Sequence, residues 1–160
     1  MEFRVADFEK LSYHFKVYQD GLKSIELKKN SFLERIEPFR REIQQIISTS
    51  QSGIVLDNMS EEKRAERFKT LQEEILAIDK EAKYILSKEK DDLTKEVYNQ
   101  LEEIISNWAV ENSVDIVIGK LEIVYMNDKY EITNDIIDIL KEKNLYIDDS
   151  ILEENEKESV

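Results

Sequence analysis

The spacing of apolar residues predicts a long helix in the first third of the chain. From residue 11 to residue 46, large apolar side chains return at alternating steps of four and three, the heptad spacing of a helix that packs on another helix. The positions are Leu11, Phe15, Tyr18, Leu22, Ile25, Lys29, Phe32, Ile36, Phe39, Ile43 and Ile46. Lys29 is the single charged member, so the stripe predicts one apolar helix face that is buried against a neighbour.

A second apolar stripe follows a polar segment. Residues 48–60, STSQSGIVLDNMS, break the helical period and predict a turn. The second stripe contains Phe68, Leu71, Ile75, Ile78, Ala82, Ile85, Leu93, Val97, Leu101, Ile104 and Trp108. Its step of eight from Ile85 to Leu93 resembles a stutter, which locally unwinds a supercoil. Together the stripes predict an antiparallel helical hairpin, a coiled-coil arm over residues 8–112 with its turn at residues 50–60.

Two residues weaken the first predicted helix. Pro38 lies inside the stripe, where a proline removes a backbone hydrogen bond and clashes with the preceding turn. We therefore expect a kink near Ile36 and a hinge at Pro38. Gly21 is a milder weak point of the same helix, because glycine is less favourable than alanine in a helix interior.

After Asn112 the apolar period becomes two, which predicts strands. Apolar side chains alternate before and after Gly119-Lys120, a pair that fits a two-residue hairpin turn with glycine first. The predicted strand faces are Val114, Ile116 and Ile118 on one side of the turn and Leu121, Ile123 and Tyr125 on the other. Phe3–Ala6 predicts one further short strand, and Thr133 is expected to cap a helix over about residues 134–143.

Three short strands expose sheet edges and bury little surface, so we expect them to associate with further copies of the chain. The predicted fold is mainly α with a small β-element: the helical arm projects from an oligomeric β-hub of residues 1–7 and 113–143. The acidic residues 144–160 are expected to be disordered. The residues expected to form the oligomer contacts of the hub are Phe3, Val5, Ile116, Ile118, Leu121, Ile123 and Tyr125.

Composition and charge exclude several classes of function. The net charge of −13 argues against nucleic acid as the main partner, since phosphate binding requires clustered Lys and Arg. The chain has no cysteine and one histidine, His14, which we interpret as a half-buried surface residue. Acid pairs such as Glu73–Glu74 diverge by about 100° on a helix, so they predict solvated surface rather than a metal or acid–base site. We expect no enzyme activity, no cofactor and no metal.

The end of the predicted arm is less acidic than the rest of the chain. Between residues 35 and 69, seven basic residues oppose six acidic ones. The candidates for contacts with clients or partners are Arg35, Arg40, Arg41, Lys63, Arg64 and Arg67. A solvated face with ion pairs between residues four apart is the more common explanation for such a cluster, and it remains open.

The predicted order of elements resembles that of the Skp/OmpH family of periplasmic chaperones. The stretch VDIVIGKLEIVYMNDKYEITNDIIDIL, residues 114–140, is similar to the C-terminal stretch of that family, and VADFEKL, residues 5–11, to its first strand and helix start. The resemblance implies a homotrimer with a β-barrel body and three helical arms around a cavity. It also implies a holdase that shelters unfolded outer-membrane proteins without ATP, so the partners would be further copies of the chain and unfolded clients.

A second hypothesis follows from the first residues and the acidity. MEFRVADFEK lacks the basic start and apolar run of a secretory signal, and no stretch approaches the ~18 apolar residues of a membrane span. As it stands, the sequence predicts a cytoplasmic protein without membrane insertion, or a periplasmic one if a signal was removed before residue 1. The alternative function is therefore a cytoplasmic coiled-coil scaffold or a chaperone dedicated to one partner, for example one encoded by a phage.

Overall fold

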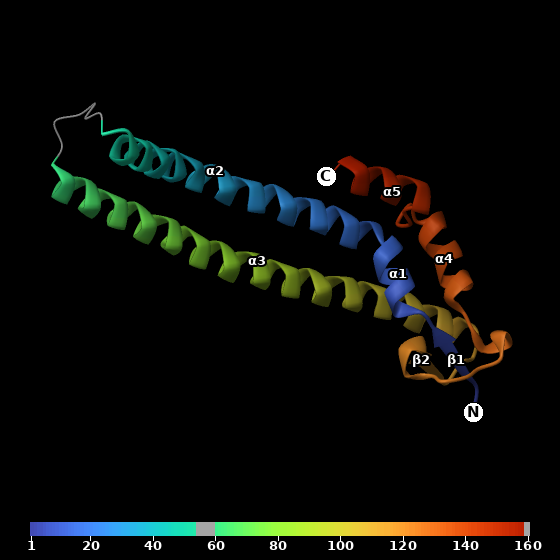
Figure 1. Cartoon of the computed structure of the whole chain (residues 1–160). Coiled ribbons are helices and arrows are strands. Elements are labelled where there is room, and N and C mark those ends of the chain that lie inside the picture. Colours follow the sequence, from blue (N-terminus) through green and yellow to red (C-terminus); the bar gives the residue numbers. More distant parts are fainter. Residues whose placement is uncertain (54–59, 159–160) are drawn as a thin grey trace. The chain divides into compact units, whose positions relative to one another are not determined.

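The computed structural model describes residues 1–53 and 60–158, and it is mainly helical with a small sheet, as predicted. Two single-turn 3-10 helices, η1 (Lys120–Glu122) and η2 (Asp128–Tyr130), lie between the second strand and the fourth helix. The other elements are β1 (Phe3–Ala6), α1 (Phe8–His14), α2 (Lys16–Ser52), α3 (Glu61–Glu111), β2 (Ile116–Gly119), α4 (Thr133–Glu142) and α5 (Asp149–Glu158) (Figure 1).

The chain divides into two compact units, which are described separately. The hairpin unit contains residues 24–90, and the sheet unit contains residues 1–23 and 91–160. The turn predicted at residues 50–60 falls mostly on residues 54–59, which lie outside the described residues. No helix within the described ranges is long and apolar enough to cross a membrane.

In the hairpin unit, α2 and α3 lie side by side and antiparallel (Figure 1). The buried core is formed by Phe32, Ile36, Ile78 and Ala82, with Phe39, Ile75, Ile85 and Leu86 packed against it. All but Leu86 belong to the two predicted stripes, so the predicted packing of one stripe on the other is confirmed. Each fully buried Ile or Phe side chain contributes roughly 1.5–3 kcal/mol to stability, and these side chains therefore hold the hairpin together.

The first long helix breaks at Phe15 and not at Pro38. α2 runs without interruption from Lys16 to Ser52 with Pro38 inside it, so the hinge at this proline stays a prediction. Phe15 has an extended backbone, with φ −74° and ψ 122°, and forms an antiparallel bridge with Tyr146. Lys16 N–H donates to the Leu145 carbonyl at 2.8 Å, which satisfies a backbone donor at the start of α2.

The predicted β-hairpin is wrong. β2 instead pairs in parallel with β1, with Phe3 opposite Ile116, and the helices between them supply the long crossover that parallel strands need. Gly119 has φ −67° and ψ 138°, whereas the first position of the predicted turn requires a positive φ. The chain therefore continues into η1, and Leu121, Ile123 and Tyr125 form no returning strand.

β1 is paired on both sides, and β2 is not. On the side away from β2, Val5 forms a bridge with Glu131 and its carbonyl accepts the Ile132 N–H at 2.9 Å. Within the described part of the chain, no strand pairs with the outer edge of β2. The residues that the structure describes therefore form an open two-stranded sheet and no closed barrel.

α4 begins one residue earlier than predicted, because Ile132 and not Thr133 occupies its N-cap position. The Thr133 hydroxyl instead accepts the Asp7 N–H at 2.9 Å and donates to Glu131 Oε1 at 3.1 Å. The buried apolar residues of α4 are Ile136, Ile137 and Leu140. Thr133 thus ties the start of α4 to the residue that follows β1.

The predicted disorder of residues 144–160 is wrong for the described part of that segment. Residues 149–158 form α5, and the Leu152 side chain is buried. Tyr146 and Leu152 supply apolar surface within this acidic segment, and the Tyr146 ring stacks on His14. The segment is thus part of the fold.

Candidate partner-binding surfaces

The residues predicted to form the hub differ widely in exposure. Val5 is completely buried, and Phe3 stacks on Tyr130 with 4.9 Å between the ring centroids, so both contribute to the fold of the single chain. Ile118 and Ile123 are half-buried. Val5 is therefore a core residue of each copy and is not available as an oligomer contact.

The remaining hub residues are exposed, and with the exposed Val124 they make up a set that we call the edge patch: Ile116, Leu121, Val124 and Tyr125. Leu121 is 75% exposed, Tyr125 is 86% exposed and Val124 is fully exposed. Val124 was not among the predicted hub residues, because the expected strand turned it away from the shared face. Exposed apolar side chains and an unpaired strand edge are each typical of a surface that another chain covers.

Two of the predicted arm-end arginines join α2 to α3 through carboxylates. Arg35 Nη1 and Nη2 lie 3.1 and 2.8 Å from the two carboxylate oxygens of Glu81, and Arg67 Nε and Nη2 lie 2.7 and 2.8 Å from those of Glu42. These hydrogen bonds lower the pKa of both glutamates and raise the pKa of both arginines. Each arginine makes two hydrogen bonds to one carboxylate, an arrangement with a specific geometry. These two arginines therefore link α2 to α3 within the hairpin.

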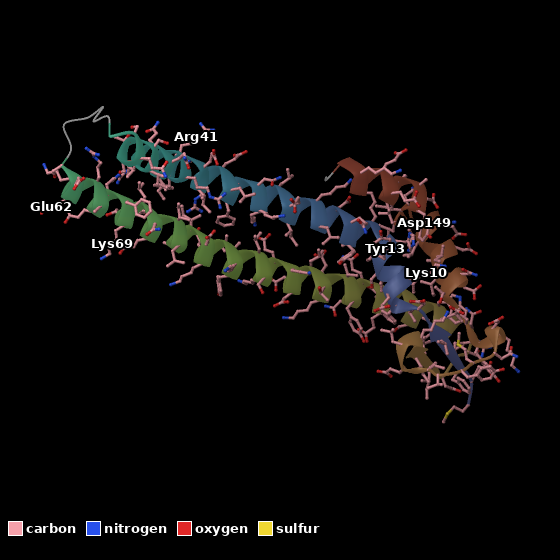
Figure 2. The ribbon with its side chains drawn as sticks, in the orientation of Figure 1. Lys10, Tyr13, Arg41, Glu62, Lys69 and Asp149 are labelled. Carbon is pink, nitrogen blue, oxygen red and sulfur yellow. The ribbon has the colours of Figure 1, made fainter. Side chains whose placement is uncertain are left out.

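The other four predicted arm-end residues lie in different settings. Arg41 pairs with Glu37 one turn away, at 3.0 Å, and its side chain lies on the outer face of α2 (Figure 2). Arg40 and Lys63 are exposed, whereas Arg64 is buried. A client contact of this cluster stays a prediction, and Arg40, Arg41 and Lys63 are exposed members of it.

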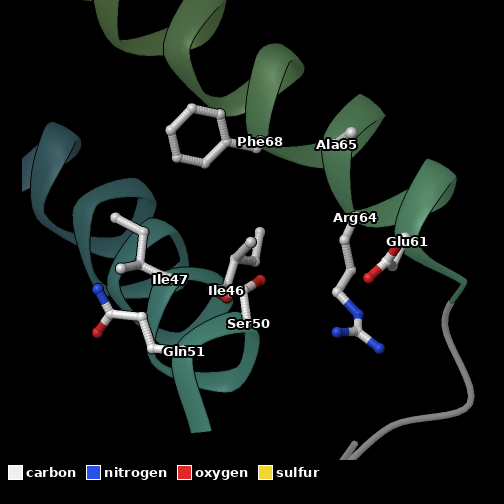
Figure 3. A pocket seen from close by; sticks show the side chains of 8 residues that line it. All are labelled: Ile46, Ile47, Ser50, Gln51, Glu61, Arg64, Ala65 and Phe68. Carbon is white, nitrogen blue, oxygen red and sulfur yellow. Dashed lines mark hydrogen bonds between the residues drawn. The ribbon is translucent and has the colours of Figure 1, made fainter. Parts of the chain in front are cut away.

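A pocket of about 440 Å³ lies between the last turns of α2 and the first turns of α3. Figure 3 shows Arg64 and Glu61 projecting from α3 and an isoleucine pair, Ile46 and Ile47, projecting from α2. Its lining residues are Ile46, Ile47, Ser50, Gln51, Glu61, Arg64, Ala65 and Phe68. The pocket combines an apolar wall with one guanidinium. The sequence pattern had placed Ile46 and Phe68 in the stripes and had not marked Ile47 or Ala65.

A second groove, of about 500 Å³, lies on the sheet unit between α1 and α3; we call it the aromatic groove. The Phe8 and Tyr98 rings stack across it, with 5.5 Å between centroids, and Tyr13 and Tyr98 are 42% and 54% exposed. Its lining residues are Phe8, Glu9, Ser12, Tyr13, Tyr18, Thr94, Val97 and Tyr98. Of these lining residues, the predicted stripes contained only Tyr18 and Val97. Phe8, Tyr13 and Tyr98 are aromatic residues outside the heptad positions, and this was the sequence signal that could have identified the groove.

His14, interpreted above as half-buried, is 5% exposed and holds the C-terminal segment. Its Nδ1 lies 2.8 Å from the Ile147 carbonyl oxygen and its Nε2 lies 3.3 Å from Asp149 Oδ1. Its ring stacks on Tyr146 at 5.0 Å, and burial raises the pKa of Tyr146, with smaller contributions from Asp149 and Asp148. Because both nitrogens of His14 face acceptors, only the doubly protonated ring donates to both.

No metal site is evident: among the described residues, no three or more His, Cys, Asp or Glu side chains gather as a metal would require. Among the described residues, three surfaces suit contact with a partner: the edge patch, the pocket between α2 and α3, and the aromatic groove. All three are apolar or aromatic with few polar groups, which suits adaptable contact with proteins better than recognition of one small molecule.

Residues 2–140 match the family described as Outer membrane protein (OmpH-like). The match begins just before β1, includes the whole of α2 and α3, and ends inside α4. Residues 145–152, which include the residues that contact His14, lie beyond the matched range. A comparison with curated proteins finds no match.

Proposed function

Because this chain belongs to the OmpH-like family, we propose that it is a chaperone of the Skp type, which holds non-native proteins without ATP and without catalytic activity. The observation that carries the proposal is the family match over both long helices and the sheet. Exposed apolar surfaces in each unit support it, since a holdase binds many sequences through weak, adaptable contacts.

The distribution of charge suits a chaperone that keeps its clients soluble. The hairpin unit has thirteen basic and thirteen acidic residues, whereas the sheet unit has ten basic and twenty-three acidic ones. The whole net charge of −13 thus belongs to the sheet unit. A strong net charge keeps a protein and its complexes apart in solution, while a neutral hairpin repels neither acidic nor basic clients.

The proposal includes a homotrimer, the assembly that the family resemblance implies. The outer edge of β2 and the edge patch are the surfaces that support it. Pairing of this edge with further copies would satisfy its free backbone groups and cover Leu121, Val124 and Tyr125. The arms of the trimer would then enclose the clients.

An aggregation assay tests the holdase function. An unfolded outer-membrane β-barrel protein is diluted from urea with and without an equimolar amount of trimer, in the absence of ATP, and light scattering is followed. We expect the scattering to rise more slowly with the chaperone than with the same mass of an inert protein. Equal rates would contradict the proposal.

The alternative is a scaffold or a chaperone dedicated to one partner, and the concentration of negative charge on one unit favours it, because a single basic partner would match that surface. The same assay with several unrelated clients separates the two. A general holdase slows the aggregation of most of them, whereas a dedicated chaperone slows the aggregation of its partner alone.

A further inference from the structure

The aromatic side chains of the aromatic groove are carried by two helices, α1 and α3, whose positions are fixed by buried residues. Leu11 of α1 and Leu101 of α3 are completely buried, and the Asp7 side chain caps α1 by accepting the Lys10 N–H at 2.9 Å. Figure 2 shows Tyr13 and Lys10 on this short helix. Tyrosines on a rigid support give contact area at little cost in conformational entropy, as at many protein interfaces.

The charge around the aromatic groove is negative. Glu9 belongs to the lining, and residues 91–103 of α3 carry five acidic residues and one basic residue. The sheet unit as a whole carries the net charge of the chain. This field attracts cationic segments and repels anionic ones, and a cation that reaches the exposed part of the Tyr13 or Tyr98 ring would gain a cation–π contribution.

We propose that the aromatic groove binds an extended client segment in which an aromatic side chain lies next to Lys or Arg. The inference rests on the proposed function, since the segment is part of a held protein, and it adds the chemistry that this surface selects. The aromatic side chain packs on Tyr98 and Tyr13, and the neighbouring cation lies in the field of Glu9. A volume of about 500 Å³ is in the range of sites for ligands of this size.

Fluorescence anisotropy with three labelled peptides tests the proposal directly. The first alternates Lys and Phe, the second replaces each Lys by Glu, and the third replaces each Phe by Ala. We expect the Lys/Phe peptide to bind at least tenfold more tightly than either of the others, and its affinity to fall with added salt. Equal affinity for all three peptides would overturn the proposal.

Variants locate the binding site. Tyr98→Ala is expected to weaken binding of the Lys/Phe peptide roughly tenfold, the usual effect of losing an aromatic contact residue at an interface. Tyr84→Ala is the matched control, because Tyr84 also lies on α3 and is 71% exposed but belongs to the hairpin unit. Glu9→Gln, an exposed substitution that spares the core, should weaken binding several-fold and reduce its salt dependence. Equal losses in Tyr98→Ala and Tyr84→Ala, or no loss in Tyr98→Ala and Glu9→Gln, would refute the assignment.

Two further results separate this inference from the proposed function. If the wild-type protein slows aggregation but does not bind the Lys/Phe peptide, the inference fails and the holdase stands. If it binds the peptide at the groove but does not slow aggregation, the holdase fails and the peptide site stands. If Tyr98→Ala changes the mass in solution and leaves peptide affinity unchanged, a second copy occupies the groove and the inference is wrong.

Discussion

At the scale of single residues, Gly21 shows how an absent side chain contributes to packing. A Cβ at Gly21 would lie 2.7 Å from Cδ2 and 3.0 Å from Cγ of Leu93, and closer still to Cδ1. Because the Leu93 side chain is buried, it has to move within packed surroundings to make room for that Cβ. The sequence marked Gly21 as a weak point, whereas in the structure Leu93 packs directly against it.

Gly21→Ala is therefore expected to destabilise the protein by about 1–3 kcal/mol, the usual cost of overpacking a core. This outweighs the roughly 0.5–1 kcal/mol by which alanine is favoured over glycine in a helix. Urea denaturation of Gly21→Ala, Leu93→Ala and the double variant measures it. The double variant should lose less stability than the two single losses combined, and a Gly21→Ala protein more stable than wild type would show that the two helices do not approach this closely.

At the scale of elements, the periodicity of apolar residues correctly predicted the two long helices, which are stabilised by contacts within one hairpin. The stripes identified both long helices, because Phe32, Ile36, Ile78 and Ala82 meet their partners through heptad positions of the same hairpin. The β-hairpin prediction failed because β2 pairs with a strand more than a hundred residues earlier in the chain. The helix break at Phe15 and the ordered C-terminal segment depend on contacts between Phe15 or His14 and Tyr146, which are also more than a hundred residues apart in the chain. The aromatic groove likewise combines residues of α1 with residues of α3. No local pattern contains such information.

The contacts between His14 and the C-terminal segment predict how readily that segment detaches from the rest of the fold. His14→Phe keeps a ring that can stack on Tyr146 but removes both nitrogen contacts, including the bond to the Ile147 carbonyl. We expect the backbone amides of Ile147 and Lys16 to exchange hydrogen several times faster than in wild type, since both amides donate hydrogen bonds between the segment around His14 and the C-terminal segment. Asp148→Asn is the control and should leave both amides unchanged. Unchanged exchange in His14→Phe would show that the imidazole does not hold the segment.

The arginine forks predict how the hairpin unit responds to acid. The pKa of Glu42 and Glu81 is lower in the folded chain than in the unfolded one, chiefly through the hydrogen bonds from Arg67 and Arg35. Such carboxylates stabilise the fold above their unfolded pKa, about 4.3, and this stabilisation is lost as the pH falls through the folded pKa. The effect is small, because both pairs are exposed to solvent.

Thermal unfolding of Glu81→Gln at pH 7 and pH 3 measures this response. We expect the variant to melt below the wild type at pH 7, and the difference to be smaller at pH 3, because the ion pair is lost as the pH falls through the lowered pKa of Glu81. Glu34→Gln, which removes an exposed acid of α2, is the control for the change in net charge. A difference between Glu81→Gln and wild type that is as large at pH 3 as at pH 7 would contradict the role of the ion pair.

At the scale of the whole molecule, the described structure leaves one edge of β2 unpaired and exposes large apolar side chains in the segment that follows this strand. The family match covers the strands that form this edge and both long helices. Caging of clients by a Skp-type chaperone requires several arms, so the proposed function depends on whether copies of the chain associate. Ile116, Leu121 and Tyr125 are predicted hub residues that the structure leaves exposed, and their role in an oligomer stays a prediction.

Sedimentation equilibrium of the purified chain tests this claim most directly. We expect a species of about 57 kDa, three times the 19.0 kDa of one chain, and a lower mass for Val124→Asp, which places a charge in the edge patch without touching the core. A wild-type protein that sediments at 19 kDa at micromolar concentration would contradict the trimer, and with it the account of clients held between helical arms.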